Sequence, residues 1–122
     1  MKVAGFGFRT SASVESLRDA LEMAGGSAGL GAIATLSEKA GSDSILALAD
    51  AIGVPVRAIP AARLRAMTTR TQSAESLAAH GTGSVAEAAA LAAAGEAARL
   101  LGSRSISTDR LATCAIATGD HP

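Results

Sequence analysis

Arg9 and Lys39 are the residues whose chemistry stands out first, because each follows an apolar segment typical of a buried strand, residues 2–8 and 32–36. Guanidinium and ammonium groups bind carboxylates and phosphates, and a guanidinium can do so through two parallel hydrogen bonds. The hydroxyl groups beside them belong to Thr10 and Ser37. These residues predict a site for a ligand with several negative charges, and solvated loop cations are the alternative interpretation.

A turn that leads into an alanine-rich helix is the second candidate anion site. Gly81 and Gly83 allow positive φ or a close approach of the backbone. Ser84 and Glu87 have the spacing of a capping box, in which each side chain accepts a hydrogen bond from the other residue's amide. Such a helix start leaves amide donors that suit an anion. A purely structural cap explains the same residues equally well.

Two residues are weak candidates for a catalytic base. His80 precedes the turn, and an imidazole titrates near neutral pH, but an exposed position at a helix end is the other interpretation. Glu87 is the second candidate, although capping accounts for it without chemistry. His121 is expected to be inert in the tail. Because no nucleophile, base and orienting group come together in the sequence, catalysis stays an open question.

Metal, disulfide and dinucleotide chemistry are not indicated. The single cysteine, Cys114, lies in an apolar run and is expected to be buried. Gly5 and Gly7 precede a predicted helix as in a dinucleotide-binding fingerprint, but Thr10 takes the place of the third glycine. We therefore predict no metal ion and no cofactor.

The elements that must position these residues alternate between strands and helices. Apolar runs predict about five strands, at residues 2–8, 32–36, 54–59, 99–106 and 111–118. Helical periodicity predicts helices over residues 14–23, 43–52, 61–67, 74–79 and 85–94, with serine caps at Ser13, Ser73 and Ser84 and a helix start at Ser42. This order predicts one α/β domain over residues 1–118, with three αβα layers and a mixed, mostly parallel sheet that ends in an antiparallel hairpin. Residues 119–122 are predicted to be a flexible tail.

Ligands of such sheets bind beyond the carboxyl ends of the parallel strands. This rule selects the loops over residues 7–13, 36–43 and 60–72, which the turn before Ser84 can join. The arginines of the third loop are Arg63, Arg65 and Arg70, and the first two are expected on the surface. The chain is thus predicted to gather positive charge at one rim of its sheet.

Composition argues against several kinds of partner. Phe6 and Phe8 are the only aromatic residues, whereas single-stranded nucleic acids are bound on aromatic platforms. The 11 basic and 11 acidic residues balance, so the chain has no global signature of a polyanion-binding protein. Neither a secretory signal nor a membrane-spanning segment is visible. We therefore expect a cytoplasmic protein that binds neither nucleic acid nor membranes.

The segment from Gly81 to Leu91 also resembles the signature Gly-x-x-Ser-Val-Ala-Glu-Ala-Ala-Ala-Leu of the carboxy-terminal domain of the CobE/CbiG family of cobalamin biosynthesis. Further segments that are similar to the family, in the same order, are Gly5–Arg9, Thr35–Lys39, Leu46–Ala49 with Gly53–Val56, and Thr113–Ala117. The resemblance covers roughly residues 1–118. Thr82 and Gly83 replace the family's usual Val-Pro, which is expected to make the turn more flexible.

This resemblance implies a ligand and a set of site residues. The family is associated with corrinoid intermediates, whose acetate and propionate arms match a basic site. By resemblance, Gly7, Arg9, Lys39 and the turn Gly81–Ser84 line the cleft, with Glu87 behind it. The chain is similar to the stand-alone members of the aerobic pathway, since nothing precedes its first strand. It is therefore expected to be a carrier or accessory protein that binds a polycarboxylate precorrin.

Two other functions remain open by resemblance. Family members of the anaerobic pathway with additional domains hydrolyse a δ-lactone of cobalt-precorrin-5A and release acetaldehyde. A hydrolase acting on a precorrin lactone or side chain is therefore the alternative. A docking partner of other cobalamin-biosynthesis enzymes is the third interpretation, because alanine-rich helix faces could pack against one.

Overall fold

Six strands form one mixed sheet in the order β3-β2-β1-β6-β4, and β5 pairs with β6 beside this path. The computed structural model describes residues 1–120. Its strands are β1 (Lys2–Phe8), β2 (Leu30–Leu36), β3 (Val56–Ile59), β4 (Arg99–Leu100), β5 (Ser105–Ile106) and β6 (Ala112–Thr118). The pairs β1–β2 and β2–β3 are parallel, whereas β6 runs antiparallel to β1, β4 and β5. The predicted mixed sheet with a closing antiparallel hairpin is confirmed.

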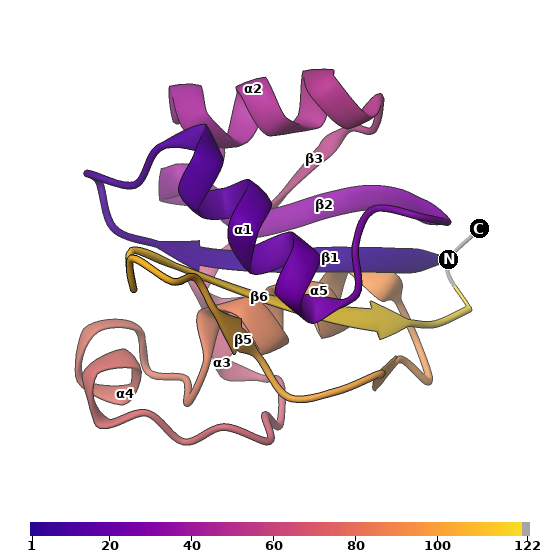
Figure 1. Cartoon of the computed structure of the whole chain (residues 1–122). Coiled ribbons are helices and arrows are strands. Elements are labelled where there is room, and N and C mark those ends of the chain that lie inside the picture. The colour runs from indigo at the N-terminus through magenta and orange to yellow at the C-terminus, as the bar shows by residue number, and fades with distance from the viewer. Residues whose placement is uncertain (121–122) are drawn as a thin grey trace.

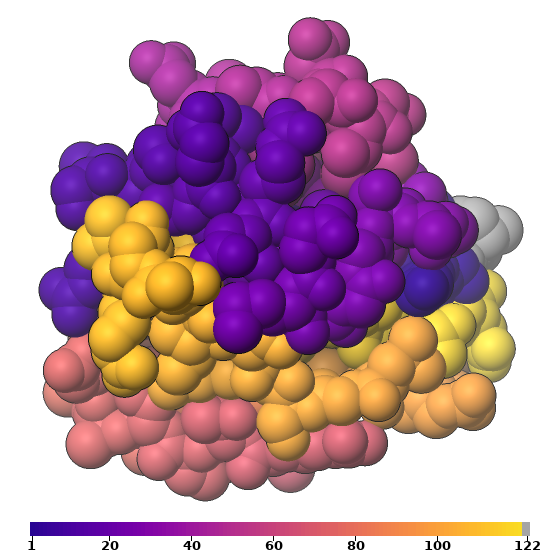
Figure 2. Space-filling view, viewed as in Figure 1, coloured from indigo at the N-terminus to yellow at the C-terminus, as the bar shows by residue number. Residues whose placement is uncertain are grey.

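Helices cover both faces of this sheet (Figure 1). The helical elements are α1 (Val14–Ala24), the 3-10 turn η1 (Ser37–Lys39), α2 (Asp43–Ile52), α3 (Ala61–Arg65), α4 (Ala74–His80) and α5 (Val85–Ala94). Helices α1 and α2 pack on one face, and α3 and α5 pack on the other, so the three-layer prediction is confirmed. Figure 2 shows the face covered by α1 and α2, with the salmon-coloured segment that carries α4 along its lower edge.

Strand β1 runs through the centre of the sheet, and its side chains alternate between the two helical layers. Val3 packs with the α5 cluster, whereas Ala4 and Phe6 pack with α1 and α2. Gly5 faces α5, and a Cβ atom added there would lie 2.1 Å from the carbonyl oxygen of Ala86. Helix α5 therefore approaches β1 so closely that only glycine fits at position 5. The small alanine side chains of α5 also permit this close approach.

Serine hydroxyls cap three of the helices, α1, α4 and α5. The Ser13 and Ser84 hydroxyls each accept a hydrogen bond from the amide three residues further on, at 3.3 and 3.2 Å. Ser42 occupies the N-cap position of α2, which confirms the expected helix start, but its side chain makes no capping bond. Gly53 ends α2 in the left-handed conformation, as expected from its position.

The first strand of the hairpin differs from the prediction. Residues 99–106 were expected to form one strand, but the ladder to β6 breaks between Leu100 and Ser105. The reason is a competing hydrogen bond, because the amide of Arg104 donates to the buried carboxylate of Glu87 at 2.8 Å. Strand β3 also begins two residues later than expected, at Val56.

The region around the chain ends is held together by backbone pairing. The Met1 ammonium donates to the Gly119 carbonyl at 2.6 Å, and the Gly119 amide donates to the Met1 carbonyl at 3.1 Å. The last two residues of the predicted tail, His121 among them, lie outside the described residues. Cys114 is buried in β6, as predicted, and burial raises the pKa of its thiol. No helix within residues 1–120 has the length and apolar character needed to cross a membrane.

Candidate functional site

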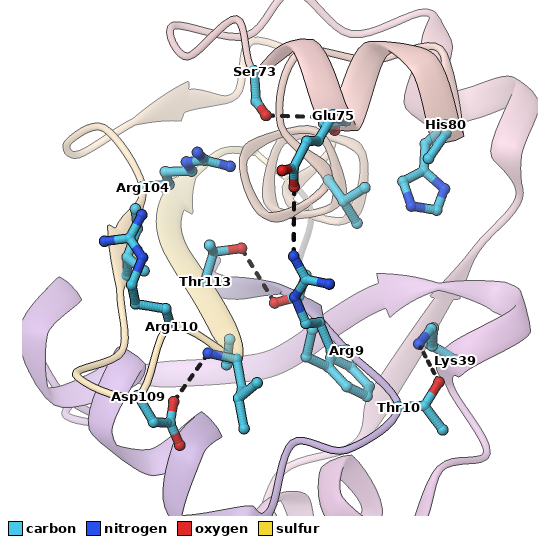
Figure 3. Close-up of a pocket in the computed structure, with 18 residues that line it drawn as sticks. Arg9, Thr10, Lys39, Ser73, Glu75, His80, Arg104, Asp109, Arg110 and Thr113 are labelled. Atoms are coloured by element: carbon cyan, nitrogen blue, oxygen red, sulfur yellow. Dashed lines mark hydrogen bonds and ion pairs between the residues drawn. The ribbon is translucent and has the colours of Figure 1, made fainter.

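An open cleft of about 790 Å³ lies at the carboxyl end of β1 (Figure 3). Four parts of the chain line it: the end of β1 with the residues that follow, Lys39 of η1, helix α4 with the start of α5, and the β5–β6 hairpin. The location agrees with the rule for ligand sites in parallel sheets. The antiparallel β6 completes the site, because Ala112 at its start pairs with Phe8 at the end of β1.

Arg9, Thr10 and Lys39 form the side of the cleft that the sequence predicts. The Lys39 ammonium donates to the Thr10 hydroxyl at 3.4 Å, and it lies 5.3 Å from the centroid of the Phe8 ring. A cation at this distance from an aromatic face is attracted by the ring quadrupole. The ring and the hydroxyl therefore direct Lys39 toward the cleft. Gly7 also lines the cleft, and its carbonyl accepts a hydrogen bond from the side chain of Thr113.

The β5–β6 hairpin adds two cations that the sequence reasoning missed, Arg104 and Arg110. Figure 3 shows them on the other side of the cleft from Arg9 and Lys39. A signal for them existed, because the sequence predicts an antiparallel hairpin between residues 99–106 and 111–118. An antiparallel strand beside β1 begins where β1 ends, so the turn that precedes it must lie at the ligand-binding edge.

Asp109 is an acidic residue of the same hairpin, and its carboxylate is engaged within the turn. It accepts hydrogen bonds from the hydroxyl of Ser107 at 2.6 Å, the hydroxyl of Ser16 and the amide of Leu111 at 3.0 Å. These bonds, the two hydroxyl donors above all, lower the pKa of Asp109. Its negative charge therefore organises the hairpin.

Helix α4 supplies the third side of the cleft. The carboxylate of Glu75 lies 3.5 Å from the guanidinium of Arg9, and this ion pair spans the opening (Figure 3). His80, at the last position of α4, also lines the cleft. Ser76 lines it too, and its buried hydroxyl group has no hydrogen-bond partner among residues 1–120.

Glu87 lies in the core and does not line the cleft. Its carboxylate accepts four hydrogen bonds, from the amides of Arg70, Thr71 and Arg104 and from the Thr71 hydroxyl. Burial alone would raise the pKa of Glu87, but these bonds outweigh it and hold the pKa below 4.5, the ordinary value. The predicted bond from Glu87 back to the Ser84 amide is therefore wrong, whereas the Ser84 half of the capping box is confirmed.

The turn before α5 packs into the protein. Thr82, Gly83 and Ser84 are buried, and a Cβ atom at Gly83 would lie 2.3 Å from the Thr71 carbonyl oxygen. Residues 82–84 of the turn are therefore closely packed, and the flexibility expected of the turn stays a prediction. The Glu87 amide at this helix start donates to the Ser84 hydroxyl, so the cap itself takes up that donor.

The structure thus divides the predicted site residues into two groups. Those that line the cleft are Gly7, Arg9, Thr10, Lys39 and His80. Those placed elsewhere are Ser37, Gly81, Gly83, Ser84 and Glu87. The loop over residues 60–72 also lies outside the lining, and two of its arginines donate to backbone carbonyls, Arg63 to Ala92 and Arg70 to Leu100. Ligand binding by any of these residues stays a prediction.

Fold and cleft together define a small α/β domain with a basic site at the carboxyl edge of its sheet. The family model described as cobalamin synthesis G C-terminus matches residues 2–117. The chain therefore belongs to this family of cobalamin biosynthesis proteins, as the resemblance predicts. No curated protein sequence matches it significantly.

Solved structures agree with this assignment. CobE, described as a protein from the cobalamin (vitamin B12) biosynthetic pathway, is 35% identical, with a TM-score of 0.86 over 96% of this chain and 89% of CobE. The cobalamin biosynthesis protein chiG of Agrobacterium tumefaciens is 30% identical, with a TM-score of 0.73 over 99% of this chain and 100% of chiG. A cobalamin biosynthesis protein G homolog of Sulfolobus solfataricus shares the fold at 23% identity and a TM-score of 0.73, over 98% of this chain and 37% of that one.

Proposed function

We propose that the protein binds a polycarboxylate tetrapyrrole intermediate of cobalamin biosynthesis in the cleft, as a carrier or accessory protein. The charge of the cleft carries this proposal. Arg9, Lys39, Arg104 and Arg110 place four of the 11 Lys and Arg side chains around one opening, in a chain with no net charge. Glu75 and Asp109 also line the cleft, so the four cations exceed the carboxylates there, and an anionic ligand offsets the remaining positive charge.

The arrangement of the cations supports a ligand with several carboxylates. Arg9 and Lys39 stand on one side of the cleft, and Arg104 and Arg110 stand on the other (Figure 3). A tetrapyrrole with acetate and propionate arms presents carboxylates on several sides of one macrocycle. Each arm can form charge-assisted hydrogen bonds to a different wall, which a ligand with one carboxylate cannot do.

A binding titration tests the proposal. Hydrogenobyrinic acid, a metal-free corrinoid polycarboxylate, is titrated with the wild-type protein and with the double variant Arg9→Ala, Lys39→Ala, and visible absorbance is followed. Hydrogen bonds to charged groups contribute about 1.5–3 kcal/mol each, so we expect the double variant to bind at least about tenfold more weakly. Its urea unfolding midpoint should stay unchanged, because neither side chain is buried.

A charge-matched control separates a local site from general attraction. The variant Arg18→Ala, Arg99→Ala also removes two cations, and both lie exposed outside the cleft. It should keep wild-type affinity at 0.15 M salt, where charges more than about 8 Å apart are largely screened. Equal affinities of the wild-type protein and the Arg9, Lys39 variant would contradict the proposal.

Hydrolysis of a precorrin lactone or side chain is the second candidate function, and the position of His80 favours it. This imidazole lines the cleft, whereas the carboxylate of Glu87 is buried and already accepts four hydrogen bonds. The test incubates the protein with cobalt-precorrin-5A and measures acetaldehyde and the substrate mass. Turnover that His80→Asn abolishes without loss of binding would establish the activity, and an unchanged mass would exclude it for this substrate.

A further inference from the structure

Helix α4 forms one side of the cleft without packing any side chain into the core. The cleft-lining residues of this segment are Ser73, Glu75, Ser76, Ala79 and His80. Burial of apolar surface is what holds the other helices on the sheet, and α4 lacks it. Segments with few buried apolar contacts open at low free-energy cost.

The two ends of α4 are attached to the protein in different ways. Before the helix, Glu87 holds the Thr71 amide at 2.9 Å, and the amide of Ser73 donates to the Gly83 carbonyl at 2.9 Å. After the helix, Gly81 adopts φ 70°, a left-handed conformation that glycine enters without strain. Anchored backbone therefore flanks α4 on both sides, at residues 71–73 and at the buried residues 82–84. Motion of α4 is confined to the segment between these anchors, and Gly81 is its permissive position.

One contact connects the exposed side of α4 with the opposite wall. It is the pair between Glu75 and Arg9, whose side chains are 87% and 65% exposed. Pairs this exposed contribute little stability, so a competing anion can separate them. Arg9 is also a group to which the proposed function assigns a ligand carboxylate.

Resting on that proposed function, we propose that α4 is a lid and that its Glu75 carboxylate occupies Arg9 while the cleft is empty. A carboxylate arm of the ligand takes the same place on the guanidinium and releases the lid. The Glu75 carboxylate therefore competes with the ligand for Arg9. A ligand with several carboxylates displaces it more readily than a ligand with one carboxylate. This contact also lowers the positive charge of the empty cleft.

Affinity of a Glu75→Gln variant for hydrogenobyrinic acid tests the competition. The amide keeps the size of the side chain and removes its charge, so we expect three- to tenfold tighter binding. The control Glu22→Gln removes an exposed charge from the last turn of α1, outside the cleft lining, and should bind as the wild-type protein does. In the Arg9→Ala background the Glu75→Gln change should lose its effect, because the contested cation is gone.

Hydrogen exchange tests the lid without a ligand. After correction for intrinsic rates, amides of residues 75–80 should exchange two- to fivefold faster in free Glu75→Gln than in the free wild-type or Glu22→Gln protein. If the wild-type protein binds the corrinoid and Glu75→Gln binds no tighter, the lid is overturned and the proposed function stands. If no variant binds, the proposed function fails, and the exchange rates decide the lid: faster exchange supports it and equal exchange overturns it.

Discussion

The sheet-side wall of the cleft and the α4 wall are held by different forces. The sheet-side wall consists of the paired ends of β1 and β6, continued by the hairpin. Asp109 accepts two hydrogen bonds within the hairpin turn and a third from Ser16 of α1. Helix α4 has no buried residue, and within the described part of the chain its one ion pair is the exposed pair between Glu75 and Arg9. A fixed wall can orient a ligand, and a loosely held wall can admit it, so the difference assigns separate tasks to the two sides.

Two glutamates, Glu87 and Glu75, differ in burial and bonding in the same way as the two walls. Glu87 has no exposed surface and four hydrogen bonds, and it ties the segments before α4 and before β5 to α5. Glu75 is exposed, and its one ion pair among residues 1–120 is with Arg9. Low-dielectric surroundings strengthen the bonds of the first carboxylate, whereas water screens the charge of the second. A carboxylate therefore holds the segments before α4 and β5 firmly at Glu87, whereas at Glu75 it holds α4 only weakly.

Alanine substitutions of Glu87 and of Glu75, made in separate variants, should give the largest difference in the free energy of unfolding. Glu87→Ala leaves four donors without their acceptor, and we expect a loss of about 4 kcal/mol in the free energy of unfolding, measured in urea at pH 7. Glu75→Ala should change it by less than about 0.5 kcal/mol. Similar losses in the two variants would contradict the comparison. If Glu87→Ala does not fold, Glu87→Gln, which keeps one acceptor oxygen, provides the measurement at about 2 kcal/mol.

The close packing behind the sheet-side wall can be broken at Gly5. A methyl group there meets the Ala86 carbonyl oxygen at 2.1 Å and the Ala90 amide nitrogen at 2.5 Å, both backbone atoms that cannot rotate away. We expect Gly5→Ala to lower the free energy of unfolding by about 2–3 kcal/mol. Gly41→Ala is the matched control, because no heavy atom lies within 4 Å of its added Cβ. Its unfolding midpoint should stay at or slightly above the wild-type value.

Lowering the pH should reduce the stability that the Glu87 carboxylate contributes. Because the folded state lowers the pKa of Glu87 below 4.5, this group contributes stability that is present above pH 4.5 and lost as the pH falls through its folded pKa. Urea unfolding of the wild-type protein between pH 6 and pH 3 should therefore lose stability more steeply than that of Glu87→Gln. Asp109, whose pKa is also lowered, titrates in both proteins and cancels in the comparison. If the free energies of unfolding of the wild-type protein and Glu87→Gln change with pH in parallel, the ionised Glu87 carboxylate does not stabilise the fold.

Most of the fold could be predicted from local patterns. The apolar run at the start of the chain, the serine before α1 and the glycine after α2 marked their elements because the signals lie within a few residues. The break between β4 and β5 could not be predicted in this way. It depends on the carboxylate of Glu87, 17 residues from Arg104 along the chain.

The candidate site was predictable on one side only. Arg9 and Lys39 follow strands, and the rule for parallel sheets places them at one edge. Arg104 and Arg110 lie in a hairpin whose position depends on β6 pairing with β1, a contact between the two ends of the chain. Glu87 had the spacing of a cap, and tertiary donors took its carboxylate instead.

The sequence by itself determined the order of strands and helices, the family and two of the cleft's cations, because propensity, capping and motif are properties of neighbouring residues. Only the tertiary structure decided that β6 lies beside β1, that four cations surround one cleft and that one glutamate is buried while another faces Arg9. Those outcomes depend on contacts between residues far apart in the chain. Such contacts form only when burial of the two apolar clusters outweighs the entropy of closing long loops.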